Sequence, residues 1–218
     1  MTRACLGLAA LSLVAGTLTS CAGSPPAHFY MLSVAPPVAT EGNGTAAPAD
    51  YSVTVGPVSL PDAVDRPQIV VRVGANQVAL LEEHRWAEPL RGEIARVIAG
   101  NLSQLLGVRR ALAYSPQTTG DEGYRVLVDI QRFDSVVGQS AQIDAAWTVR
   151  GAKGSARKTG RTVTRESVNE DSYDALVAAH SRALATVSAE IAEAIHTMNS
   201  TGTKPSPPAA VPAPAPAP

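Results

Sequence analysis

The apolar residues of this chain follow two different periods, and their alternation strongly constrains the possible fold. Residues 51–55, 124–137 and 141–150 alternate apolar and polar positions, as half-buried strands do. Residues 88–106 and 172–198 instead carry apolar stripes at helical spacing. The order of strands, helix, strands and helix predicts a single α+β domain. In it a mixed or antiparallel sheet packs with two long amphipathic helices on one of its faces.

The expected elements end at recognisable turn and cap residues. Pro89 falls in the first turn of the first helix, and Gly107 follows its last apolar residue as a C-cap. Ser172 is placed to cap the second helix. Tight turns are expected at residues 74–76 and 138–140. The expected strands are 28–34, 51–55, 68–73, 77–81, 124–137, 141–150 and 161–168.

The predicted helical stripes supply the candidate core. In the first helix the stripe consists of Leu90, Ile94, Val97, Ile98, Leu102, Leu105 and Leu106. In the second helix it consists of Leu176, Ala179, Ala183, Leu184, Val187, Ile191, Ala194 and Ile195.

The N-terminus has the pattern of a targeting segment. Arg3 precedes an uncharged stretch, 6–18, that is shorter than the roughly 20 apolar residues needed to span a bilayer. It leads into Leu18, Thr19, Ser20 and Cys21, which together resemble a bacterial lipobox. We therefore expect residues 1–20 to be a signal peptide and Cys21 to carry palmitate-type acyl chains. The alternatives are an ordinary secretory peptide with a chance cysteine, or a free thiol in the core.

The two cysteines of the chain both lie in this segment. Their placement excludes a disulfide framework and any Cys-based zinc site in the body of the protein. After cleavage Cys21 would be the single cysteine, and two or three acyl chains would anchor the protein stably. Residues 21–27 would form a short lipidated tether to a domain spanning 28–198. The balance of 18 basic against 19 acidic residues argues against nucleic-acid binding.

Two further segments are poor in core-forming residues. Residues 35–50 are rich in Pro, Gly, Ala and Thr, and are expected to form a flexible loop. Residues 199–218 form a Pro/Ala-rich tail that is expected to be disordered and biased towards polyproline II. The tail is interpreted either as a passive end or as a spacer within the periplasm or cell wall.

No motif in the sequence indicates catalysis. The four histidines lack metal-ligand spacing, and no Gly-x-Ser-x-Gly elbow occurs. We expect no enzyme activity, no catalytic residue, no metal and no cofactor. His84, among charged residues, is interpreted as part of a solvated approach to the first helix, with an acid/base cluster as the alternative. The basic segment 151–160 is interpreted as an exposed hairpin loop, or as a contact for anionic headgroups or a partner.

Four sequence blocks point to a known family. They are 29–32 (FYML), 55–61 (VGPVSLP), 65–72 (DRPQIVVR) and 86–90 (WAEPL). In this order they resemble the ABC-type transport auxiliary lipoproteins, the PqiC-like family. The resemblance by motif covers residues 29–106, and the second half agrees only in its pattern of paired strands and a closing helix.

The resemblance implies a lipoprotein of the Gram-negative cell envelope that works beside MCE-domain proteins and an ABC transporter in lipid traffic. Ala22 after the cysteine resembles the outer-membrane sorting signal. A surface for a partner or for self-association is expected at Asp65, Arg66, Pro67 and Gln68.

The same blocks also have physical interpretations. Pro61 and Pro67 bound an irregular segment in which Asp65 and Arg66 pair or cap the chain. Trp86, Glu88 and Pro89 form a structural motif at the start of the first helix. A homo-oligomer is expected, because strand edges need pairing and an MCE ring is cyclic. Alternative functions are a structural envelope lipoprotein whose tail is a spacer and, third, a small periplasmic hydrolase.

Overall fold

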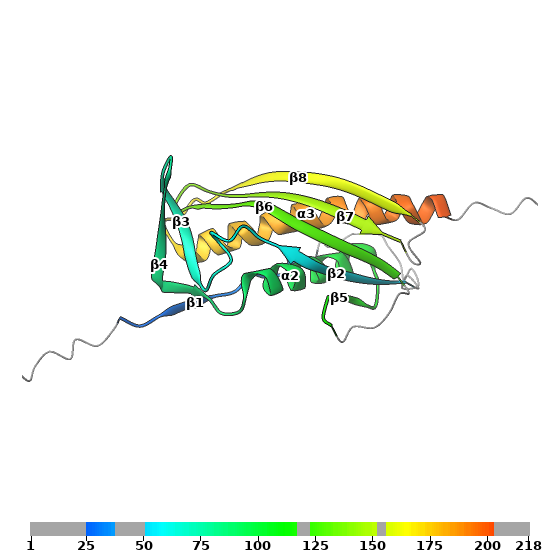
Figure 1. Cartoon of the computed structure of the whole chain (residues 1–218), viewed down its shortest axis with the longest axis horizontal. Helices are drawn as coiled ribbons and strands as arrows, with labels where there is room; N and C mark the ends of the chain where they lie inside the picture. Colours follow the sequence, from blue (N-terminus) through cyan, green and yellow to red (C-terminus); the bar gives the residue numbers. More distant parts are fainter. Residues whose placement is uncertain (1–24, 38–50, 117–122, 152–155, 203–218) are drawn as a thin grey trace, which may run out of the picture.

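The computed structural model describes residues 25–37, 51–116, 123–151 and 156–202. The expected signal peptide with Leu18, Thr19, Ser20 and Cys21, most of the 35–50 loop and nearly all of the tail lie outside the described residues. The described chain forms one α+β domain with two sheets and two long helices, elongated along the helix axes (Figure 1).

The larger sheet is mixed and has five strands. Strand β2 (Ser52–Ser59) runs parallel to both of its neighbours, β5 (Ala111–Ala113) and β6 (Gly123–Val136). From β6 the chain continues as an antiparallel meander through β7 (Ser140–Arg150) to β8 (Arg157–Ser167). The resulting order is β5-β2-β6-β7-β8.

The smaller sheet stands at one end of the molecule (Figure 1). Strands β3 (Gln68–Gly74) and β4 (Gln77–Trp86) form the predicted hairpin, and β1 (His28–Tyr30) adds to β4 in parallel. The order is β1-β4-β3.

Two helices cover one face of the five-stranded sheet. Helix α2 (Leu90–Leu106) packs on β2 and β5, whereas α3 (Tyr173–Gly202) packs on β7 and β8 and against α2. Gly107 ends α2 in the left-handed conformation, with φ 61° and ψ 26°, as predicted. The Ser172 hydroxyl accepts a hydrogen bond from the amide of Ala175 at 3.2 Å and caps α3. Pro89 lies just before α2 rather than inside its first turn, and α3 continues four residues past its expected end at 198.

The core fills the space between the helices and the sheet. Every residue of the predicted α3 stripe is buried. In α2 the prediction is wrong only for Leu105, which is 44 % exposed, whereas Leu102 is fully buried. The inward face also holds two polar side chains of α2 that the apolar pattern did not anticipate, Glu93 and Asn101.

The chain after β1 differs from the expected strand. Pairing with β4 stops at Tyr30, and the following residues lie across α2 and α3 instead. Because Leu32 is buried, the backbone amides of this segment need hydrogen-bond acceptors within the protein. Side chains of α2 and α3 provide these acceptors in place of a neighbouring strand. Three amides donate to these side chains: Leu32 to Glu93 (3.0 Å), Ser33 to Ser181 (3.1 Å) and Ala35 to Asn101 (2.9 Å).

Three strands are longer than the sequence pattern predicted, since β2 continues to Ser59, β4 continues to Trp86 and β8 begins before residue 161, and one short strand was missed. Strand β8 begins at Arg157, so the second half of the basic segment 151–160 is strand rather than loop, and residues 152–155 lie outside the described chain. The short strand β5 was not predicted. Its three residues pair with β2 and are too few for a period to be recognised.

Candidate docking site

The segment between β2 and β3 is irregular and is closed by local hydrogen bonds. The amides of Val64 and Asp65 both donate to the carbonyl of Pro61, at 3.0 and 3.2 Å. At the other end of the segment, the amide of Trp86 donates to the carbonyl of Pro67 at 2.8 Å. This last bond fastens the segment to the end of β4, so that two sequence blocks about 20 residues apart become neighbours.

These neighbours enclose a cavity of about 340 Å³. It contains six of the seven residues that the sequence singled out in the two blocks, and Gln68 is the exception. Gln68 begins β3 and donates from Nε2 to Glu82 Oε2 at 3.1 Å. We call this cavity the motif pocket; it is lined by Asp65, Arg66, Pro67, Trp86, Ala87, Glu88, Pro89 and Leu90.

Of the two arrangements expected for Asp65 and Arg66, mutual pairing is wrong, whereas Arg66 does cap the backbone of the segment. Asp65 pairs with Arg91 on α2 rather than with Arg66, and Arg91 Nε donates to Asp65 Oδ1 at 3.2 Å. The Arg66 guanidinium donates from Nη2 to the carbonyl of Asp62 at 3.3 Å. Its Nε is buried and has no hydrogen-bond partner within the described chain. The Arg66 guanidinium is therefore only partly satisfied, and its half-buried side chain lines the motif pocket.

The walls of the motif pocket are stiff and apolar. Trp86 is 6 % exposed and meets the ring of Phe133 edge-on, with centroids 6.2 Å apart. Pro67 and Pro89 are exposed and have fixed backbone angles. The lining thus combines apolar side chains with one cation, Arg66, and two carboxylates, Glu88 and the Arg91-paired Asp65.

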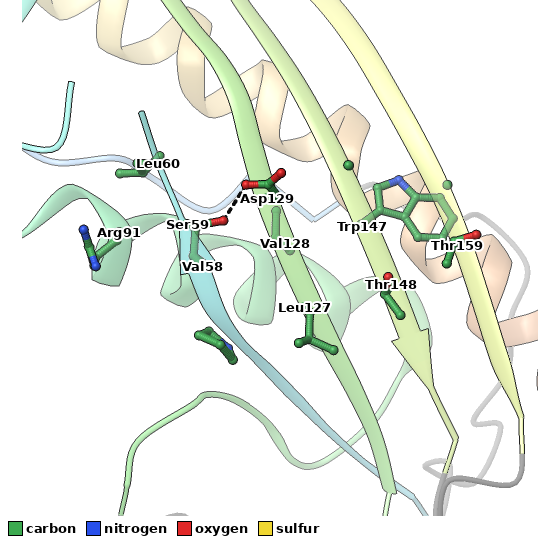
Figure 2. A pocket seen from close by; sticks show the side chains of 13 residues that line it. Val58, Ser59, Leu60, Arg91, Leu127, Val128, Asp129, Trp147, Thr148 and Thr159 are labelled. Carbon is green, nitrogen blue, oxygen red and sulfur yellow. Dashed lines mark hydrogen bonds between the residues drawn. The ribbon is translucent and has the colours of Figure 1, made fainter. Parts of the chain in front are cut away.

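A second hollow, of about 640 Å³, lies on the open face of the five-stranded sheet (Figure 2). Figure 2 shows Leu127, Asp129 and Thr148 on the face opposite the helices. Ser59 donates its hydroxyl proton to Asp129 Oδ1 at 2.5 Å. Arg91 lines this hollow and pairs with Asp65 of the motif pocket, so the two hollows adjoin across one ion pair.

No sequence pattern pointed to this second hollow. Its sequence signal is the run of small or polar residues at outward positions of β6, β7 and β8, such as Ala146, Thr148 and Thr159. Such residues are common on an exposed sheet face and do not by themselves indicate a hollow. The hollow forms because Pro57 and Leu60 lie next to them in the folded chain.

His84 belongs to an aromatic cluster rather than to a solvated helix approach or an acid/base site. Its Nδ1 lies 2.8 Å from the Tyr30 hydroxyl, and its ring centroid lies 3.9 Å from that of Tyr173. Burial and then the neighbouring His28 lower the pKa of His84. This cluster fastens β1 and β4 to the start of α3.

A Ser–His pair lies in the core. The Ser135 hydroxyl oxygen is 2.8 Å from His180 Nε2, and the imidazole stacks on Phe133 with centroids 3.9 Å apart. Burial lowers the pKa of His180 to about 3, and its Nδ1 has no hydrogen-bond partner in the described chain. Because His180 is 1 % exposed, a substrate does not reach this pair, and we interpret it as a packing contact.

Within the described ranges, no group of three His, Cys, Asp or Glu side chains is placed to hold a metal ion. None of the described helices has both the length and the hydropathy to cross a bilayer.

The described residues form an α+β domain with two adjoining surface hollows. The chain belongs to the ABC-type transport auxiliary lipoprotein component family, whose model matches residues 30–192. The match includes the second half of the domain, where the motifs are weakest. It makes the chain an auxiliary lipoprotein of ABC-type transport, in agreement with a non-catalytic role.

Solved structures share the fold at low identity. A crystal structure of an uncharacterized protein is 19 % identical, with TM-score 0.63, and the match covers 78 % of this chain and 99 % of that one. Protein XCC0632 from Xanthomonas campestris is 18 % identical, with TM-score 0.59, covering 81 % of this chain and 100 % of that one. No curated protein matches the sequence.

Proposed function

We propose that this protein is an outer-membrane lipoprotein that docks an MCE/ABC-type lipid transport assembly to the membrane without catalysing a reaction. The observation that carries the proposal is the motif pocket, because residues from two separate sequence blocks converge on one surface cavity. Residues that only maintained the fold would not need to line a cavity together. Family membership supports the association with an ABC transporter.

The membrane attachment is proposed at Cys21 through acyl chains. Pro25, Pro26 and Ala27 are all exposed, so the chain leaves the domain at its surface, four residues after Cys21. This position supports an anchor on a short tether. The outer membrane, with the domain on the periplasmic side, is proposed from the Ala22 sorting signal.

The docking mode follows from the chemistry of the motif pocket. Half-buried Arg66 makes no ion pair within the described chain, and Pro67 and Pro89 offer exposed apolar surface beside it. A partner loop that inserts an acidic or carbonyl-bearing residue would pair with Arg66 while covering these prolines. We propose an MCE-domain protein as the source of that loop.

Capture of partners from native envelopes tests this function. The full lipoprotein is crosslinked in intact cells, and co-purifying proteins are identified by mass spectrometry. We expect MCE-domain and ABC transporter components with the wild type and their loss with Arg66→Glu. Arg109→Glu is the matched control, because Arg109 is an exposed arginine just beyond the opposite end of α2. Equal capture by both variants would contradict docking at the motif pocket.

Lipidation is tested separately with Cys21→Ala. We expect an uncleaved or mislocalised precursor without lipid mass. Recovery of the wild type with inner membranes on a density gradient would contradict the outer-membrane assignment.

We also propose that the domain self-associates, either through the motif pocket or through a sheet edge. Strand β8 is one edge of the larger sheet, and its exposed Arg157, Arg161 and Arg165 discourage pairing there, which favours the motif pocket or the opposite edge strand, β5. Light scattering on the full mature chain decides this point. A strict monomer at tens of micromolar would contradict self-association.

A further inference from the structure

The smaller sheet has one face towards the core and one towards solvent. On β3, Ile69 and Val71 belong to the core, so Val70 between them lies on the outer face, although Val70 itself is only 9 % exposed. Leu80 of β4 pairs with Val70, and Val78 is two residues before Leu80, so both share this outer face. Leu80 is 42 % exposed and Val78 is 46 % exposed.

Strand β1 adds a large aromatic side chain to the same face. Phe29 pairs with Arg85, whereas the next residue, Tyr30, pairs with Trp86, which belongs to the core. Phe29 therefore lies on the outer face, where it is 65 % exposed. Met31, just after β1, is 51 % exposed. We call Phe29, Met31, Val78 and Leu80 the apolar end.

The exposed apolar residues are concentrated rather than scattered. Nine large hydrophobic side chains are exposed in the described part of the chain, and five of them lie on the β3–β4 hairpin, on β1 or directly after it. Clustered apolar exposure marks contact sites for proteins or membranes. The charged arginines beside it are paired: Arg85 with Glu82 at 3.4 Å, and Arg72 with Asp134 at 3.1 Å. Attraction to this face is thus apolar rather than electrostatic.

The position of the apolar end indicates what it contacts. In Figure 1 the small sheet stands at the end of the molecule where the described chain begins. Cys21 is eight residues before Phe29, so the two Cα atoms lie at most about 28 Å apart. An acylated Cys21 therefore holds the apolar end beside the bilayer. A weak apolar contact suffices there, because the tether has already removed most of the entropic cost of encounter.

We propose that the apolar end rests directly on the lipid surface, which makes it a second membrane contact of this lipoprotein. The inference rests on the proposed lipidation of Cys21. It orients the domain with the C-terminal end of α3, at the opposite end of the molecule, away from the membrane (Figure 1). The lipid anchor alone would leave the domain free to tumble on its tether.

A pair of matched leucines tests the contact. Leu80 and Leu112 lie on strands and are 42 % and 43 % exposed, but Leu112 is on β5, in the other half of the molecule (Figure 1). Leu80→Cys and Leu112→Cys each introduce one free thiol into the mature lipoprotein, because acylation occupies Cys21. Each thiol is labelled with an environment-sensitive fluorophore. The protein is then reconstituted into phosphatidylethanolamine/phosphatidylglycerol vesicles containing nitroxide-labelled lipid.

We expect a blue shift and strong quenching for the label at position 80, and an unshifted, unquenched signal at position 112. Adding Phe29→Ser and Met31→Ser should reverse the shift at position 80 while leaving the melting temperature unchanged, because both side chains are exposed. Equal signals at positions 80 and 112, or a shift that survives the double substitution, would overturn the proposal.

Attaching the protein to the vesicle by a different tether tests the membrane contact independently of the lipidation of Cys21. In the mature chain with Cys21 replaced by a hexahistidine tag, nickel-chelating lipids hold the same end on the vesicle. The contrast between positions 80 and 112 should persist with this tether, and its loss would overturn the contact. Failure of the untagged protein to float with vesicles would instead contradict lipidation at Cys21.

Discussion

Asp65 and Arg91 form an ion pair that joins the irregular segment after β2 to the first turn of α2, with Arg91 Nε donating to Asp65 Oδ1 at 3.2 Å. Asp65 lines the motif pocket and Arg91 lines the hollow on the open sheet face. The pair therefore forms the boundary between the two surface hollows, and its geometry fixes how the segment carrying Arg66 is presented.

A double-mutant cycle on this pair separates stability from docking. The Arg91 side chain is 54 % and the Asp65 side chain 21 % exposed, so we expect a coupling free energy of unfolding of at most about 1 kcal/mol between Asp65→Ala and Arg91→Ala. Partner capture should fall in both single variants, because the segment with Arg66 loses its attachment. Urea unfolding measures the coupling free energy. A coupling of several kcal/mol would show that the pair is structural rather than positional.

Two leucines of α2 test which face of the helix is core. Leu102 is fully buried, so Leu102→Ala should lower the free energy of unfolding by about 2–5 kcal/mol. Leu105, three residues on, is 44 % exposed, and Leu105→Ala should change it by less than about 0.5 kcal/mol. Urea denaturation of both variants provides the comparison. Similar losses for the two variants would be inconsistent with this helix orientation.

His180 makes stability depend on acid. Burial lowers the pKa of His180 from 6.5 to about 3, so below pH 6.5 the unfolded chain binds a proton that the folded chain does not. The free energy of unfolding should then fall with decreasing pH, by up to about 1.4 kcal/mol per pH unit between these values. Replacing His180 with Gln should remove this contribution from the pH slope, whatever it costs in packing.

His196 supplies the control for this measurement, because it is exposed on the same helix. Denaturant unfolding at several pH values should give the wild-type slope for His196→Gln. An unchanged slope in His180→Gln would refute the assignment of the acid sensitivity to His180.

Two glycines are expected to respond to alanine with opposite signs. A Cβ at Gly160 would overlap the indole of Trp147, which donates to Thr162 Oγ1 at 3.0 Å and is held in place. Gly160→Ala should therefore cost about 1–3 kcal/mol and shift the tryptophan fluorescence. Gly92 lies in α2 with open space around its Cβ position, and Gly92→Ala should stabilise by about 0.5–1 kcal/mol. Thermal melts of the two variants check both signs.

The sequence determined the element types because local periodicity and cap residues act within a few positions. Gly107 and Ser172 cap their helices as expected, and the hairpin turns at Ala75 and Asn76. The family blocks were likewise visible as contiguous runs. Their convergence was not, because it depends on the bond between Trp86 and Pro67.

Long-range contacts, in contrast, were decided only by the tertiary structure. Leu105 fits the apolar stripe of α2 but lies beyond the edge of the contact with the sheet, so its apolar character did not bury it. Glu93 breaks the stripe and is nevertheless fully buried, because its carboxylate accepts the amide of Leu32 from a segment 61 residues away. Asp65 pairs with Arg91 rather than with its neighbour Arg66. Periodicity reports which face of an element is apolar; which polar groups meet across the fold depends on packing between distant segments, and no local pattern encodes it.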